Sequence, residues 1–246
     1  VVLVSENDSS TELQCLNTEL QENRVRVVAK GAETNVLSVL EEDLKKVPNE
    51  SKISQAEFRA SLLVKASEKQ KRIVLPEGNE PRTIEAAILA YERKIAIPVL
   101  LGNRKEIEEI ARAKNLTIPE GLEILEVTEE SGKKYVPTLV ELRKAKGMTE
   151  ELATNLLKDS VWLGTMMLKM GEVDGLVSGA VHSTADTVRP ALQIIKTAPG
   201  VKSISSVFFM CLPSETLVYG DCAITPNPDA ETLATIAAQS NDTAKA

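Results

Sequence analysis

The pattern of apolar positions predicts alternating strands and helices in the middle of the chain. Short apolar runs, typical of buried strands, occur at "KRIVL", "IAIPVLLGN" and "LEILEV". Between the first two runs, Ile84, Ala87, Ile88 and Tyr91 recur at helical spacing. A charged helix is expected after the second run, from Arg104 to Lys114. Strands and helices that alternate at this spacing favour βαβ units and a parallel sheet.

Two helices are expected next, over 135–146 and 149–170, with Gly147 ending the first. In the second helix one apolar face is predicted to lie in the core rather than to bind a ligand. This face consists of Leu156, Leu163, Met167 and Met170.

The last third of the chain predicts a buried strand at Val173 to Val177 and a helix from Ser183 to Lys196. Two apolar runs, "SVFFMCLP" and "LVYGDCA", flank the polar "SET" and indicate a hairpin inserted in the layered pattern. A final helix is expected from about Asp229 to the end of the chain.

Residues 1–54 are polar and uneven, and we interpret them as the tail of an upstream module and a linker. A helix that carries Phe58, Leu62 and Leu63 begins at about Gln55 and opens the main domain, 55–246. There are no internal repeats.

Composition excludes several classes of partner. The net charge of −7 and the 3% of aromatic residues argue against nucleic acid and anionic membranes. Three cysteines without a CxxC pattern favour a reducing compartment and no metal site. Because no apolar run approaches the roughly 20 residues of a membrane span, we expect a cytoplasmic protein. The opening "VVLVSEN" lacks a methionine, which leaves an upstream targeting segment open.

Familiar phosphate and hydrolase motifs are absent, including GxxxxGK[ST], GxGxxG, GxSxG and HExxH. The segment "LPEGNEPRT" instead predicts a strand, a polar loop and a helix with Pro81 and Arg82 in its first turn. A cation there opposes the helix dipole by about 0.3 to 1 kcal/mol. A bound anion would offset this conflict, since arginine matches phosphate oxygens in pairs. The alternative is an ion pair with Glu77, Glu80 or Glu85.

The same arrangement recurs in "VHSTADTVRP", with Ser183 or Thr184 as the N-cap and Arg189 one or two turns into the helix. Arg189 could bind an anion or pair with Asp186. Arg143, in "ELRKAKG", lies in a last helical turn, where a cation complements the dipole without any ligand.

His182 is the only histidine of the chain and lies among small and hydroxylated residues between a strand and a helix. Backbone amides converge at such a junction and bind negative groups. His182 could be a general base or a hydrogen-bonded structural residue. Asp221, in "YGDCA", could be a turn carboxylate or an active-site acid.

Several long segments together support a specific resemblance. They are "KRIVLPEGNEPRTIEAA", "LVELRKAKGMT", "GEVDGLVSGAVHSTADTVRPALQIIKTAPG" and "VYGDCAITPNPDAETLATIAAQS". From about Phe58 to Ala246 the chain closely resembles the phosphate acetyltransferase family. The resemblance implies an α/β fold of two domains, with mainly parallel sheets and flanking helices, as in isocitrate and isopropylmalate dehydrogenases. The active site would lie in the cleft between the domains.

The resemblance also implies the reaction, in which acetyl-CoA and phosphate give acetyl phosphate and coenzyme A. Transfer is direct, without a metal or cofactor, and a homo-oligomer is expected. The substrate-binding residues implied by matching positions are Arg82, Arg143, Ser183, Thr184 and Arg189. His182 would shape this anion site.

One departure from the family affects the catalytic residues. The serine, arginine and aspartate that act on the thioester and on the coenzyme A thiol belong to a later segment, expected beyond Ala246. Residues 55–246 would then be the N-terminal and middle part of the family domain, inactive alone. Within the chain, His182 and Asp221 stay as the catalytic candidates.

Two other functions stay open. Phosphate butyryltransferase differs chiefly in the room for the acyl chain. A non-catalytic, ligand-sensing domain, like the phosphotransacetylase-like tail of some malic enzymes, would require a malic-enzyme module upstream, and residues 1–54 do not resemble the end of one.

Overall fold

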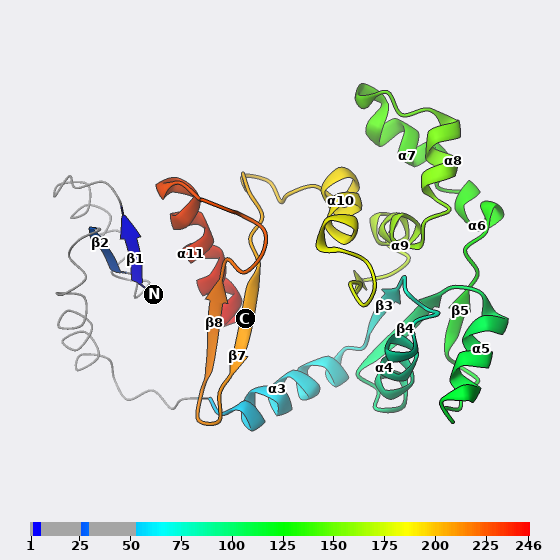
Figure 1. The fold of residues 1–246 in the computed structure, drawn as a ribbon, viewed down its shortest axis with the longest axis horizontal. Coiled ribbons are helices and arrows are strands. Elements are labelled where there is room, and N and C mark those ends of the chain that lie inside the picture. The colour runs from blue at the N-terminus through cyan, green and yellow to red at the C-terminus, as the bar shows by residue number, and fades with distance from the viewer. Residues whose placement is uncertain (1, 6–25, 30–52) are drawn as a thin grey trace. The chain divides into compact units, whose positions relative to one another are not determined.

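Four parallel strands form a sheet in the order β5-β4-β3-β6. Their bounds are β3 Lys71–Leu75, β4 Ala96–Leu101, β5 Glu123–Leu125 and β6 Gly175–Leu176. The structure is a computed structural model that describes residues 2–5, 26–29 and 53–246. The sheet belongs to the first of two units, Ala60–Ala198 (Figure 1). The predicted parallel sheet and its βαβ connections are confirmed.

Helices cover both faces of this sheet. Helices α4 (Pro81–Glu92) and α5 (Arg104–Ala113) pack on one face, and α9 (Ser160–Lys169) packs on the other. Successive side chains of β4 point to opposite faces of the sheet, so this strand contributes to the core on each face. Leu100 faces α4 and α5, and Leu101 faces α9. The chain builds outward from β3 to β5, then reverses to reach β6. Because parallel crossovers are almost always right-handed, this reversal predicts that helices before and after it lie on opposite faces.

The predicted helix over 149–170 is wrong, because the segment forms two helices, α8 (Glu150–Leu156) and α9. The carboxylate of Asp159 accepts hydrogen bonds from the amides of Val161 and Trp162 and starts α9 anew. The buried face therefore differs from the predicted one and includes Leu157, which is 1% exposed. Leu163 and Met167 are buried as predicted, but Leu156 is only partly buried and Met170 is 50% exposed.

The remaining helices of this unit are α6, α7 and α10, with a 3₁₀ turn after α7. Their bounds are α6 Glu129–Lys133, α7 Val136–Arg143, the turn Lys144–Lys146 and α10 Thr184–Ile194. Gly147, at φ 75°, ends the α7 segment as expected. Helix α10 packs beside α9 and α7 (Figure 1).

The second unit, which includes Pro199–Ala246, contains an antiparallel hairpin, β7 (Val207–Cys211) and β8 (Thr216–Gly220), as predicted from the two apolar runs. Helix α11 (Ala230–Lys245) packs against β8 and buries Ile236 and Ala237. Helix α3 (Gln55–Glu68) forms where expected and has no buried residue.

Most of the predicted upstream module and linker, 1–54, lies outside the described residues, as does Cys15. Its two described strands, β1 (Val2–Ser5) and β2 (Arg26–Ala29), pair in parallel. In the described part of the chain, no helix has the length and apolar character needed to cross a membrane.

Candidate functional site

The loops that follow β3 and β6 meet at the carboxyl edge of the sheet. Strands β3 and β6 are neighbours, although the chain reaches β4 and β5 before it returns to β6. In α/β sheets ligands bind outside the carboxyl ends of the strands, where the strand order reverses. The described structure therefore brings the loop from Glu77 to Arg82 beside the loop from Gly179 to Ser183.

The carboxylate of Glu77 joins these two loops. Its Oε2 accepts hydrogen bonds from the amides of Gly179 (2.9 Å) and Ala180 (2.8 Å). Its Oε1 accepts from the amides of Val181 (2.9 Å) and His182 (2.8 Å), and the His182 ring Nδ1 lies 2.8 Å from the same oxygen. The amides converge as the sequence suggested, but their anion is a side chain of the chain itself.

Two glycines make this geometry available. Gly78 donates its amide to the carbonyl oxygen of Leu101, and a Cβ at Gly78 would lie 2.4 Å from that oxygen. The chain can therefore cross the end of β4 only without a side chain here. Gly179 has φ +112°, a conformation that L side chains rarely adopt, and it opens the loop around the Glu77 carboxylate.

The Glu77 side chain is buried, at 4% exposure. Burial by itself raises the pKa of this carboxyl group, but the amides of His182, Val181 and Ala180 and the His182 ring outweigh burial and lower the pKa to about 2. Glu77 is therefore ionised at neutral pH, and it can only accept hydrogen bonds.

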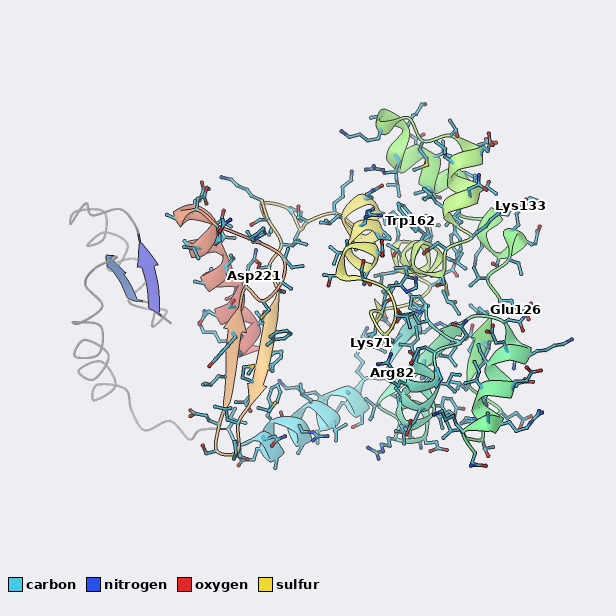
Figure 2. The ribbon with its side chains drawn as sticks, in the orientation of Figure 1. Lys71, Arg82, Glu126, Lys133, Trp162 and Asp221 are labelled. Carbon is cyan, nitrogen blue, oxygen red and sulfur yellow. The ribbon has the colours of Figure 1, made fainter. Side chains whose placement is uncertain are left out.

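The unfavourable position of the Arg82 charge at the N-terminus of α4 is offset by Glu80. Glu80 caps α4 by accepting hydrogen bonds from the amides of Arg82 (2.7 Å) and Thr83 (3.0 Å). Its other oxygen pairs with Arg82 Nε at 2.6 Å, and this side-chain hydrogen bond is the main reason that the pKa of Glu80 is lowered. A second guanidinium nitrogen of Arg82, labelled in Figure 2, donates to the Ala180 carbonyl at 2.8 Å.

The start of α10 carries the other predicted residues. Ser183, not Thr184, is the N-cap, and its hydroxyl accepts from the Asp186 amide and donates to the Asp186 carboxylate at 2.6 Å. Arg189 lies 3.6 Å from Asp186, and its side chain is 58% exposed. This long, solvated contact is worth little.

Arg143, at the end of α7, differs from the other two arginines. Its Nε is buried, and no acceptor bonds to it among the residues that the structure describes. Helix α7 packs against α10, the helix that carries Arg189. A buried guanidinium donor without an acceptor indicates that an anion or a water completes this position.

Asp221 lies in the second unit, in the loop after β8 (Figure 2). Its carboxylate accepts from the Ser206 hydroxyl and from the amides of Ser206, Ala223, Ile224 and Thr225. Burial raises the pKa of Asp221, but these hydrogen bonds, led by the Ser206 hydroxyl, hold it well below its ordinary value. A carboxylate held in this way is a weak base.

Two cavities in the described part of the chain lie apart from the sheet-edge site. A cavity of about 640 Å³ in the first unit is lined by Lys133, Tyr135 and Glu172, among others, and by none of the predicted site residues. One of about 540 Å³ in the second unit includes Asp221 in its lining. Within the described ranges, no cluster of His, Cys, Asp and Glu side chains could hold a metal ion.

The lowered pKa of Glu77 predicts a pH-dependent stability. Its pKa is 4.5 ordinarily and about 2 in the fold, so its contribution is complete above pH 4.5 and is lost as the pH falls from there toward 2. The contribution is about 3 kcal/mol. In urea unfolding of the wild type and Glu77→Gln, we expect the difference in unfolding free energy to shrink by about this amount between pH 6 and pH 2. A difference in unfolding free energy that does not change with pH would contradict the lowered pKa of Glu77.

The hydrogen bonds of Asp221 predict a structural role. Asparagine keeps one acceptor oxygen where the carboxylate has two, so Asp221→Asn should lower the unfolding free energy by about 1 to 3 kcal/mol. Urea unfolding followed by circular dichroism measures this loss. Asp242→Asn, a change of an exposed carboxylate on α11, is the matched control and should have little effect. Unchanged stability in Asp221→Asn would show that the loop does not need the charge.

Comparison with known proteins places the described segment in a family. The family model for "Phosphate acetyl/butaryl transferase" matches residues 57–246. A phosphate acetyltransferase of Haemophilus influenzae is 48% identical over 97% of this chain and 34% of its own length. That of Nitrosomonas europaea is 55% identical over 81% of this chain and 28% of its own length. The chain thus spans about a third of the length of these curated relatives.

Solved structures agree with this result. The EutD phosphotransacetylase from Staphylococcus aureus has 43% sequence identity and a TM-score of 0.68, over 74% of this chain and 55% of that one. A phosphotransacetylase from Streptococcus pyogenes has 40% identity and a TM-score of 0.69, over 76% and 57% of the two chains. Since the family model covers all of 57–246, the chain belongs to the phosphate acetyl/butaryl transferase family.

Proposed function

We propose that the protein transfers an acetyl group between coenzyme A and inorganic phosphate. The observation that carries the proposal is the 48% identity to the Haemophilus influenzae phosphate acetyltransferase across 97% of this chain. Acetyl-CoA and phosphate are the proposed substrates, and no metal or cofactor takes part in the proposed transfer.

We place the anionic groups of the substrates at the carboxyl edge of the sheet. The proposed binding residues are Arg82, Arg143, Ser183, Thr184 and Arg189. Two observations support this site: the buried Arg143 Nε lacks an acceptor in the described chain, and Arg189 is largely free of its weak partner Asp186. An arginine fork pairs well with phosphate oxygens.

We propose that neither His182 nor Asp221 is the base that deprotonates the coenzyme A thiol. The Nδ1 of His182 is engaged by Glu77, and the Asp221 carboxylate is occupied by hydrogen-bond donors. We propose that other groups deprotonate the thiol and polarise the thioester carbonyl. His182 is proposed to shape the anion site.

Finer features of fold and assembly belong to the same proposal. The family membership supports a two-domain architecture like that of isocitrate and isopropylmalate dehydrogenases. We also propose a homo-oligomer that works in the cytoplasm.

The proposed function is tested with the protein at its natural length. Acetyl-CoA and phosphate are supplied, and released coenzyme A and acetyl phosphate are measured together. We expect both products in equal amounts, with slower turnover of butyryl-CoA. Faster turnover of butyryl-CoA would favour phosphate butyryl transfer, and binding of acetyl-CoA without either product would favour a ligand-sensing domain.

The Arg143 Nε, which has no acceptor among the described residues, predicts the largest loss among single arginine variants. Removing a charge-assisted hydrogen bond costs about 1.5 to 3 kcal/mol, so Arg143→Ala should lower kcat/KM for phosphate or coenzyme A roughly 10-fold to 150-fold. Arg112→Ala, which removes an exposed arginine of α5, is the matched control. If both variants keep wild-type kinetics, Arg143 is not part of the binding site.

A further inference from the structure

The Glu77 carboxylate is held mainly by backbone amides of a distant loop. Four consecutive backbone amides, from Gly179 to His182, and one imidazole nitrogen converge on its two oxygens at 2.8 to 2.9 Å. The partners lie 102 to 105 residues away in sequence, on the other side of the point where the strand order reverses. Successive amides in this arrangement form an anion-binding nest.

We propose that Glu77 is a positioning residue for the transfer reaction, which holds the loop of residues 179–182 in the conformation that presents Ser183 and Thr184 to the substrate anion. This inference rests on the proposed function. Helix α10 begins at Thr184, and its N-cap Ser183 directly follows His182, the last residue whose amide Glu77 binds, so the carboxylate sets where this helix starts.

Arg82 completes the restraint from the same loop after β3. While Glu77 accepts from the amide of Ala180, Arg82 donates to the carbonyl of the same residue. Both polar groups of Ala180 are therefore held by residues only five positions apart. The Ala180 backbone cannot rotate without breaking one of these bonds, and Glu80 in turn fixes Arg82.

The contact with Glu77 also orients the ring of His182. An ionised carboxylate only accepts, so Nδ1 carries the proton, and Nε2 is the nitrogen left for a ligand or a water. Glu77 thereby sets the tautomer as well as the position of the imidazole.

No other common side chain reproduces these contacts. Glutamine has a single acceptor oxygen, and its NH₂ group would face amide donors. Aspartate keeps the charge but is one methylene shorter. Alanine would leave the four amides without their anion, and a small carboxylate from solution could then occupy the nest.

The experiment compares Glu77→Ala, Glu77→Gln and the wild type, each at natural length, with and without sodium formate. Sodium chloride at equal ionic strength is the salt control. Hydrogen exchange of the peptide that contains residues 179–182 reports the loop, and initial rates report KM for phosphate and kcat. Formate is the probe because it carries the same carboxylate on a smaller body.

We expect faster exchange of this peptide in Glu77→Ala and a KM for phosphate raised about tenfold to hundredfold, which corresponds to a loss of about 1.4 to 2.7 kcal/mol of orienting interactions. Formate should slow the exchange and lower KM in Glu77→Ala. Glu77→Gln should show the same defects without rescue, because its amide still fills the nest.

Asp174→Ala is the matched control. Asp174 also links β3 to the segment before β6, through the Arg72 amide and Lys71, but at the opposite edge of the sheet. We expect this variant to leave KM unchanged and to be insensitive to formate.

The outcomes separate this inference from the proposed function. Wild-type exchange of residues 179–182 in Glu77→Ala, or a KM for phosphate that does not move, overturns the positioning role. A defect in kinetics that formate worsens or leaves unchanged while the loop is restored also overturns it. If the wild type transfers no acetyl group, the proposed function fails, whereas the exchange data still report the loop.

Discussion

The hydrogen bonds of the Glu77 carboxylate are the interaction on which the candidate site depends. Strands β3 and β6 share only two register pairs, Ile73 with Gly175 and Val74 with Leu176, so the sheet alone gives the following loops little support. Four amides of the second loop would lose their hydrogen bonds to Glu77 without this side chain, and a hydrogen bond to a charged group contributes about 1.5 to 3 kcal/mol. The side chain thus supplies the restraint that the short strand cannot.

A carboxylate also accepts hydrogen bonds from converging backbone amides in the second unit. Asp221 collects the amides of its own loop and of Ser206, as Glu77 collects those of the loop after β6. In both places backbone geometry suited to an external anion is satisfied by an internal carboxylate. Amides that converge on one point therefore identify an anion site, but they do not say whether the anion belongs to the ligand or to the chain.

The arginines show the complementary situation. Arg82 is shared by Glu80 and the Ala180 carbonyl, Arg189 has a weak partner, and the buried Arg143 Nε has none in the described chain. The sequence suggested all three as anion ligands, and an ion pair as the alternative for Arg82 and Arg189. On the sequence alone Arg143 is the weakest of the three candidates, because a cation in a last helical turn complements the dipole without a ligand. The structure reverses this order, because acceptors in the loops and at the start of α10 pair with Arg82 and Arg189. The sequence does carry a signal for Glu77, an acid between Pro76 and Gly78 directly after a buried strand, but from the sequence it is expected only as a partner of Arg82.

The sequence by itself determined the order of strands and helices, the parallel sheet and the hairpin, because apolar periodicity and turn residues act over short distances. It also located the two polar loops at strand ends. Tertiary structure decided the break between α8 and α9, where burial of Leu157 and the Asp159 cap outweigh helical spacing. It alone decided that Glu77 and the amides before α10 meet, since β3 and β6 become neighbours only when the chain reverses across the sheet and buries a carboxylate among donors from a distant loop.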